Sequence, residues 1–229
     1  MFKVVYNEKR RINQCNVLFF LAEINNIKNA IEETYNCISN VSWINNFSDE
    51  NVIKAYCVRT KITIDKLREA FEQVNFLSSS TGEYIISITA KNVIVSELKY
   101  KDIPLGELIK ERAIGNGGFD YYSENLIDKI AIFGEAKYKK NTSTYSIAIN
   151  QIVSFINKEK DVSDFLEVDK FMEYETAVNM NNKVKGFSAG FCFYGNEKKI
   201  IDYLMKSNDF IELTKYKEII LIGVKFNEN

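Results

Sequence analysis

After Pro104 the apolar pattern of this 229-residue chain switches repeatedly between helical and strand-like spacing, and this alternation restricts the fold most strongly. Apolar residues three and four apart predict helices, whereas short runs of β-branched and aromatic residues predict strands. Strands that alternate with helices form a sheet covered by helices, so we predict an α/β fold with a mixed sheet flanked by helices. The expected order is a helix from Pro104 to about Ile114, a strand after Asp120, a strand at Ile130–Tyr138, a helix at Tyr145–Ile156, a strand at Gly186–Tyr194, a helix at Glu197–Met205 and a strand at Glu218–Phe226.

The first third of the chain differs in composition, because residues 1–81 contain neither glycine nor proline. We divide the chain into an N-terminal α/β region, residues 1–81, which is a candidate for partner binding, and a core domain, residues 82–229. The loop expected at Ser78–Gly82 marks the boundary. The other elements expected before Pro104 are strands at Phe2–Tyr6, Asn16–Ile24, Glu83–Ala90 and Val93–Tyr100 and helices at Asn26–Ser39, Val52–Tyr56 and Thr63–Leu77.

Histidine is absent from the chain, and its absence limits the available chemistry. Ser-His-Asp and Cys-His catalysis, His-Glu-x-x-His zinc sites and nucleases with a histidine base are excluded. The four cysteines are scattered without a Cys-x-x-Cys pair, so neither a zinc site nor a disulfide framework is expected. A Gly-x-x-x-x-Gly-Lys-Ser/Thr loop is also missing, so the chain is not itself a P-loop ATPase. Carboxylates, lysine, tyrosine or a metal ion remain for proton transfer.

No apolar run approaches the roughly twenty residues of a membrane span, and the first residues lack the form of a signal peptide. We therefore expect a cytoplasmic protein that makes no contact with a membrane. The formal net charge is −1, so any binding of nucleic acid must come from local patches of charge.

The strand expected at Ile130–Tyr138 carries Glu135 and Lys137 two residues apart. Alternate residues of a strand point to one face, so the carboxylate and the ammonium lie side by side. Asp120 follows a glycine pair and lies close to both if its segment pairs with this strand. An aspartate combined with Glu-x-Lys in this way predicts a metal-dependent nuclease. Asp120 and Glu135 would bind Mg²⁺, with Mn²⁺ as an alternative, and Lys137 would orient or deprotonate the attacking water.

A Glu-x-Lys pair alone is common on solvated strands, and the chain contains a second one at Glu97 and Lys99. The second pair has no upstream aspartate framed by glycines, and its middle residue, Leu98, is larger than Ala136. The surroundings of the first pair therefore support the prediction more than the pair itself does.

Further polar residues are candidates for the same site. Glu107 and Glu111 are four residues apart on the helix expected after Pro104, so they share a face, and either is a candidate for an additional metal ligand. Gln151 is a candidate for contact with a phosphate or a metal-bound water. Four lysines are candidates for contacts with the DNA backbone that do not read sequence: Lys139, Lys140, Lys183 and Lys185. An ordinary solvated surface is an equally good interpretation of Glu107, Glu111 and Gln151, and lysine runs are more often solvated faces than binding sites.

Several short segments together resemble the HamA family, the nuclease subunits of the bacterial Hachiman anti-phage system. They lie within roughly residues 104–195 and are Leu105–Glu107, Gly118–Asp120, Phe133–Tyr138, Ala148–Ile152 and Lys185–Ala189. The resemblance implies a PD-(D/E)xK restriction-endonuclease-like core with Asp120, Glu135 and Lys137 in the catalytic positions. It also implies a partner, a HamB-like superfamily 2 helicase, that holds the nuclease in check. The chain departs from the family pattern at Tyr121 and Tyr122, where a Phe-His-like pair is expected.

The leading hypothesis from the sequence is thus a Mg²⁺-dependent, sequence-indifferent DNA endonuclease that acts as effector of a two-component anti-phage defence system. Two alternatives remain at this point. One is a stand-alone restriction or repair nuclease of the same fold. The other is a non-catalytic regulatory subunit of a helicase.

Overall fold

A computed structural model of the chain describes residues 1–72, 78–110 and 117–227. In this described part the strands form one seven-stranded sheet of order β1-β2-β7-β6-β5-β4-β3. Strands β2, β7, β6 and β5 run parallel, and the outer strands pair antiparallel. The strands are β1 (Lys3–Ile12), β2 (Cys15–Ile24), β3 (Lys101–Asp102), β4 (Tyr121–Asn125), β5 (Ile130–Lys137), β6 (Lys185–Cys192) and β7 (Glu218–Phe226). The predicted mixed sheet is confirmed.

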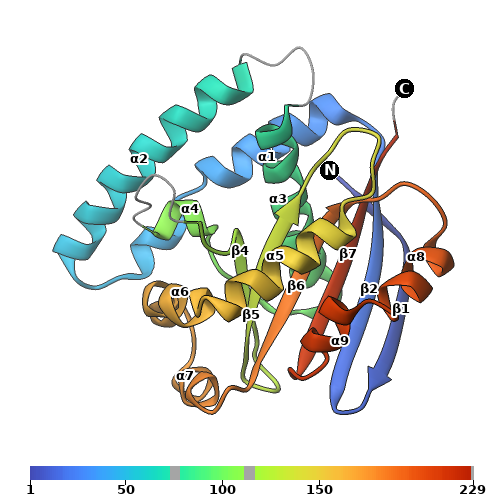
Figure 1. Cartoon of the computed structure of the whole chain (residues 1–229). Helices are drawn as coiled ribbons and strands as arrows, with labels where there is room; N and C mark the ends of the chain where they lie inside the picture. Colours follow the sequence, from blue (N-terminus) through green and yellow to red (C-terminus); the bar gives the residue numbers. More distant parts are fainter. Residues whose placement is uncertain (73–77, 111–116, 228–229) are drawn as a thin grey trace.

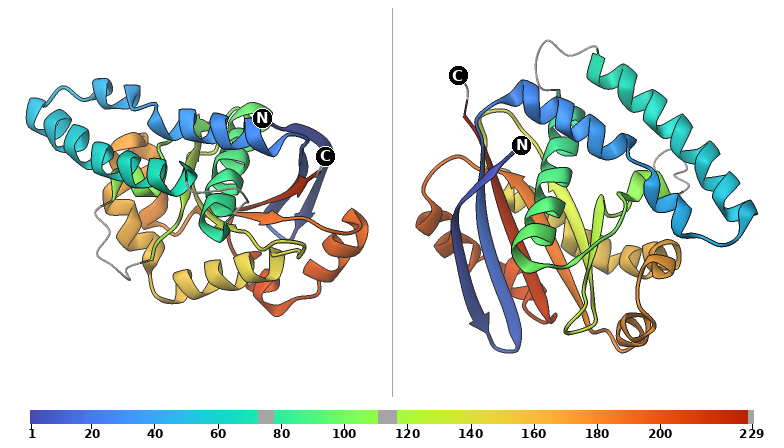
Figure 2. Two further views of the ribbon diagram at one scale, coloured as in Figure 1. Left: turned by 90° about the horizontal axis from the view of Figure 1, so that it is seen from above. Right: turned by 180° about the vertical axis from the view of Figure 1, so that it is seen from behind.

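Helices cover both faces of this sheet, with α3 on one face and α5 on the other (Figures 1 and 2). Helix α1 packs on α3, and α2 packs on α1 and α4 at one side of the molecule. No helix in the described ranges is long and apolar enough to span a membrane. The helices are α1 (Ile27–Ser39), α2 (Glu50–Glu72), α3 (Ser79–Leu98), α4 (Gly106–Ile109), α5 (Tyr145–Asn157), α6 (Lys160–Val168), α7 (Tyr174–Asn181), α8 (Glu197–Leu204) and α9 (Asn208–Leu213), with short 3-10 turns η1 (Ser42–Asn46) and η2 (Asp169–Phe171).

The sheet separates two apolar cores, and strand β5 contributes alternate residues to each. Ala131 and Phe133 pack under α5, whereas Ile132 and Ala136 pack under α3. This division follows from the two-residue period of a strand that is covered on both faces. Glu135 is two residues after Phe133, so its side chain leaves the strand on the same face, the one covered by α5.

The N-terminal strands belong to the same sheet as the rest of the chain. β2 pairs with β7 over the full range from Asn16 opposite Glu218 to Ile24 opposite Phe226. The expected strand at Asn16–Ile24 is therefore confirmed, and the strand expected at Phe2–Tyr6 extends to Ile12. Strands from both sides of residue 81 share one hydrogen-bonded sheet.

The two strands predicted at Glu83–Ala90 and Val93–Tyr100 are wrong, because one helix, α3, spans both. Ser78 begins it by accepting a hydrogen bond from the Thr81 amide at 3.1 Å, so the predicted loop at Ser78–Gly82 is the first turn of this helix. Helix α3 is buried on most sides and therefore lacks the amphipathic period that indicates a helix. It ends at Lys99, whose φ of +60° is left-handed.

The helix predicted from Pro104 to about Ile114 is also wrong in length. Helix α4 ends at Ile109, and Lys110 is extended with a ψ of 141°. Other predicted helices agree with the structure within a few residues, although the two expected at Val52–Tyr56 and Thr63–Leu77 merge into α2 up to Glu72, and residues 73–77 lie outside the described residues. Helices α6 and α7 occupy residues for which no element was predicted.

Glu218 gives the fold a testable dependence on pH. It is 2% exposed, and both of its carboxylate oxygens accept hydrogen bonds from the Tyr100 hydroxyl, at 2.9 and 3.0 Å. Burial raises its pKa from 4.5 to about 7, although the Tyr100 hydrogen bond opposes the rise. The folded protein therefore holds this proton more tightly than the unfolded chain does.

The resulting stabilisation is fully present below pH 4.5 and is lost as the pH rises through about 7. We expect the free energy of unfolding to fall by about 3 kcal/mol more for the wild type than for Glu218→Gln over this range. Urea denaturation at pH 4.5 and pH 8 checks this, with the exposed Glu212→Gln as control. Equal losses in wild type and Glu218→Gln would contradict it.

Candidate active site

The site predicted from the sequence forms where β4 pairs antiparallel with β5. Tyr121 lies opposite Gly134, and the Asp120 amide donates to the Gly134 carbonyl at 2.8 Å. One Asp120 carboxylate oxygen, Oδ2, accepts a hydrogen bond from the Ala136 amide at 2.9 Å. The Asp120 side chain therefore lies against the backbone between Glu135 and Lys137, as the predicted pairing requires.

Glu135 and Lys137 lie side by side, with the Lys137 Nζ atom 2.7 Å from the Glu135 Oε1 atom. Glu135 is 1% exposed, and Lys137 is partly buried. Gly134 is on the other face of β5, where a Cβ atom would lie 2.1 Å from the Tyr121 ring. A glycine is thus required at this position for the aromatic ring to cover the back of the strand.

Glu83 is a site residue that the sequence analysis missed. It lies near the start of α3, and its Oε1 atom is 3.7 Å from Lys137 Nζ. It was missed because α3 was interpreted as strands, which gave Glu83 no relation to Lys137. The available signal was Ser78, since recognising it as a helix cap would have put Glu83 on the first turns of a helix.

A cleft of about 170 Å³ opens beside Asp120 and is lined by acidic and hydroxyl side chains. Glu83 and Glu107 both line it, and Tyr84 donates a hydrogen bond to the Glu107 carboxylate. The structure therefore brings Glu107 next to Asp120. The predicted face shared by Glu107 and Glu111 is wrong, because α4 ends before Lys110; Glu111 itself lies outside the described residues.

Burial, and after it the crowding of acidic groups, controls the protonation of the site. Burial raises the pKa of Glu135 well above its usual range, and the Asp120 carboxylate adds to this while Lys137 opposes it. Burial also raises the pKa of Glu83. For Lys137, burial disfavours the ammonium, but the carboxylates around it, Glu135 first, outweigh burial and raise its pKa.

The residues fit a divalent cation with hard oxygen ligands. The Oε2 atom of Glu135 is buried and has no hydrogen-bond partner among the described residues, and Asp120 lies beside it. No three acidic or cysteine side chains in the described ranges converge closely enough to enclose a metal by themselves. Mg²⁺ does not require such a cage, because it keeps several waters and binds through one or two carboxylates.

A buried ion pair supports the backbone that precedes Asp120. The Lys110 Nζ atom lies 2.9 Å from Asp164 Oδ2 and donates to the Phe119 carbonyl at 2.8 Å. The same Asp164 oxygen accepts from the Phe119 amide at 2.8 Å. A Cβ atom at Gly118 would lie 2.6 Å from Lys110 Nζ and 2.7 Å from the Asp164 carboxylate. The lack of a side chain at Gly118, two residues before Asp120, therefore leaves room for this ion pair.

The structure separates the predicted DNA-contacting lysines into two groups. Lys139 and Lys140 are exposed directly after β5, close to Lys137. Lys183 is exposed, but it precedes β6 at the opposite end of the sheet.

The prediction for Lys185 is wrong, because this residue is 7% exposed and pairs with Asp161 on α6. Lys185 lies opposite Ala131, whereas Lys137 lies opposite Phe191. Six residues of strand separate these positions, a distance of roughly 20 Å. Gln151 is partly buried on α5.

No model of a protein family matches the chain, and no curated protein matches it. The chemistry of the site therefore follows from its geometry and from the sequence.

The raised pKa of Glu135 predicts that a divalent cation displaces protons when it binds. The cation binds the carboxylate form, so its affinity is expected to increase as the pH rises toward that pKa. Calorimetric titration with Mn²⁺ in two buffers of different ionisation enthalpy measures the released protons. Glu135→Gln is expected to abolish the release. Equal heats in both buffers for the wild type would contradict this.

Proposed function

We propose that this chain is a metal-dependent DNA nuclease with a PD-(D/E)xK core. The observation that carries the proposal is the buried Oε2 atom of Glu135, which has no hydrogen-bond partner in the described part of the chain and lies next to the Asp120 carboxylate and the Lys137 ammonium. A buried carboxylate oxygen without a donor is costly unless a cation or a proton occupies it. A cation between Asp120 and Glu135 would remove this cost and would meet an approaching phosphate.

In this proposal Asp120 and Glu135 hold Mg²⁺ or Mn²⁺, and Glu83 and Glu107 line the approach. When bound, the cation would offset the negative charge of the phosphate and make a nearby water more acidic. Lys137 stays protonated among the carboxylates, so it would orient the water and stabilise charge that develops on the phosphate. Lys139 and Lys140 would contact the DNA backbone, which favours cleavage without sequence preference.

The chain is further proposed to act as the effector of a two-component anti-phage system of the Hachiman type. Support for this comes from the segments that resemble HamA. One of them, Phe133–Tyr138, contains Glu135 and Lys137. In this proposal a HamB-like helicase restrains the nuclease until it meets abnormal DNA. Helices α1 and α2, which stand at one side of the sheet, are the proposed region of contact (Figure 2).

Incubation of the purified protein with supercoiled plasmid tests the nuclease activity. We expect nicked and then linear DNA with Mg²⁺ or Mn²⁺ and intact plasmid with excess chelator. The incubation is repeated with the helicase partner and damaged DNA, because the partner controls access in this proposal. Cleavage that is equally fast with chelator would contradict the proposal.

The two alternatives give different results. A stand-alone nuclease of this fold would cut plasmid with metal and would not copurify with a helicase. A regulatory subunit would copurify with the helicase, and plasmid would remain intact with metal and partner present.

A further inference from the structure

A second polar cavity, of about 370 Å³, lies at the end of the sheet opposite Glu135 and Lys137. We call it the turn-side cavity because turns and strand ends of several strands surround it. Strands β5, β6 and β7 are parallel, so their first residues meet at this end, whereas Lys137 is the last residue of β5. Its lining residues are Arg11, Gln14, Asn16, Asp128, Ile130, Val184 and Lys217.

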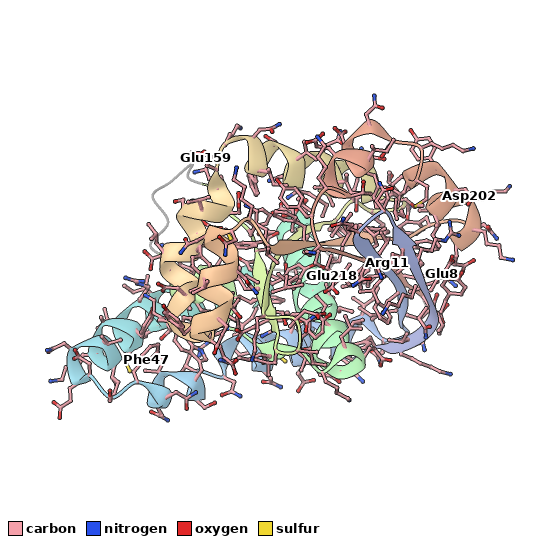
Figure 3. All side chains as sticks on the ribbon, turned by 90° about the horizontal axis from the view of Figure 1, so that it is seen from below. Glu8, Arg11, Phe47, Glu159, Asp202 and Glu218 are labelled. Carbon is pink, nitrogen blue, oxygen red and sulfur yellow. The ribbon has the colours of Figure 1, made fainter. Side chains whose placement is uncertain are left out.

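The register of the sheet places two lining residues of this cavity, Arg11 and Asn16, in one row with Glu218, which directly follows the lining residue Lys217. Arg11 on β1 lies opposite Asn16 on β2, and Asn16 lies opposite Glu218 on β7. Paired residues of neighbouring strands share a face, and Figure 3 shows Arg11 and Glu218 near one another at this end. Arg11 and Lys217 are exposed, and neither side chain forms an ion pair within the described ranges. The positively charged side chains of Arg11 and Lys217 are thus available to a ligand.

Asp128 is the acidic member of the lining, and a hydrogen-bonded chain holds it. The Asn125 side-chain amide donates to Asp128 Oδ2 at 3.1 Å and to the Tyr100 hydroxyl oxygen at 2.8 Å. Tyr100 in turn donates to the buried carboxylate of Glu218 at 2.9 Å. This series of hydrogen bonds holds the exposed Asp128 carboxylate in place as an acceptor at the edge of the cavity.

The backbone around the cavity is unusual in three separate turns. Asn13, Lys129 and Lys183 have φ values of 54°, 53° and 61°, in the left-handed region that side-chain-bearing residues rarely adopt. Each is directly next to a lining residue, Gln14, Asp128 and Val184 respectively. Three further residues with positive φ, Lys99, Asn141 and Glu159, lie away from the cavity, so the three turns next to lining residues define the rim of the cavity rather than its ligand.

We propose that the turn-side cavity binds a nucleoside monophosphate. Arg11 and Lys217 suit its phosphate, because guanidinium and ammonium groups make strong charge-assisted hydrogen bonds to phosphate oxygens. Asp128 suits the ribose hydroxyls, which donate to a fixed carboxylate. Val184, which is partly exposed, gives the base one apolar side chain to pack on, and the amides of Gln14 and Asn16 line the same cavity for its polar edge.

The size and charge of the cavity favour this ligand over simpler anions and over a nucleic-acid strand. The volume falls in the range of small-molecule pockets and exceeds what one phosphate needs. A strand of nucleic acid would place several phosphates near Asp128, which would repel them. One phosphate next to two cations and a sugar next to one carboxylate match the lining better.

Calorimetric titration of the full chain without divalent cations tests the proposal. Adenosine, guanosine, cytidine and uridine monophosphates are compared with adenosine and with inorganic phosphate. We expect saturable binding of at least one monophosphate, at least about tenfold tighter than either fragment. Absence of saturable binding of all four at millimolar concentration would overturn the proposal.

The monophosphate affinities of substituted proteins test whether the ligand binds in the turn-side cavity. Arg11→Gln and Lys217→Gln are each expected to weaken binding at least about tenfold. Lys61→Gln, which removes an exposed lysine on α2, and Glu135→Gln are expected to bind as the wild type does. Circular dichroism confirms that each variant is folded. Unchanged affinity in both cavity variants, or loss of affinity in Glu135→Gln, would assign the ligand elsewhere and overturn the proposal.

Discussion

Glu135→Gln is expected to reduce the rate of metal-dependent DNA cleavage by at least about a thousandfold, because loss of a metal-bound charge costs several kcal/mol. The amide keeps the volume of the side chain but removes a buried carboxylate that lies 2.7 Å from the Lys137 ammonium. Lys137→Met is expected to produce a loss of similar size, since the ammonium faces the same position. Initial rates of plasmid nicking with saturating Mg²⁺ measure both variants.

The second Glu-x-Lys pair provides a matched control. Glu97 and Lys99 are exposed at the end of α3, and Lys99 donates to the Ser96 carbonyl at 2.6 Å. Glu97→Gln and Lys99→Met change the same residue types in the same spacing away from Asp120. They are expected to leave the cleavage rate within about twofold of the wild type, as for exposed groups. Equal losses at both pairs would mean that Glu135 has no special role.

The buried ion pair between Lys110 and Asp164 carries the largest expected effect on stability. Asp164→Ala removes the carboxylate that the Lys110 ammonium, the Phe119 amide and the Tyr122 hydroxyl share, in a site where Lys110 is 8% exposed. Removing one member of a buried pair costs about 3–5 kcal/mol. The melting temperature and the urea midpoint are both expected to fall. DNA cleavage is expected to fall as well, because this ion pair supports the backbone before Asp120.

The double variant Lys110→Met with Asp164→Leu tests the cause of that loss. Replacing both charges by apolar groups leaves no uncompensated ion, so most of the lost stability is expected to return. Asp169→Ala, at an exposed aspartate on η2, is the control and is expected to change the free energy of unfolding by less than about 0.5 kcal/mol. A double variant no more stable than Asp164→Ala would show that the charge pair is not the cause.

Local rules of chain geometry were sufficient to predict the centre of the candidate site. Glu135 and Lys137 share a face because they are two residues apart on a strand, and Asp120 joins them through a short antiparallel connection. Both relations involve residues close in sequence, so no long-range contact had to be known. The mixed sheet was predictable for a similar reason, since its four parallel strands, β2, β5, β6 and β7, each have an apolar run of their own.

The remaining parts of the site depend on burial and on contacts between distant segments. Helix α3 is buried on most sides, so its sequence lacks a clear helical period, and without the Ser78 cap as a guide Glu83 was not related to Lys137. Lys185 looks like a surface lysine in the sequence, yet Asp161 on α6 neutralises it inside the protein. The ion pair of Lys110 and Asp164 joins residues 54 positions apart, which no local pattern reveals.

Location of Mn²⁺ by anomalous diffraction in crystals of the protein tests the central claim most directly. The account predicts a peak within about 2.2 Å of a carboxylate oxygen of both Asp120 and Glu135, the distance for such ligands. The peak is expected to disappear in Glu135→Gln crystals soaked in the same way. Saturating Mn²⁺ that gives no peak at these oxygens, or a peak that persists unchanged in Glu135→Gln, would contradict the account.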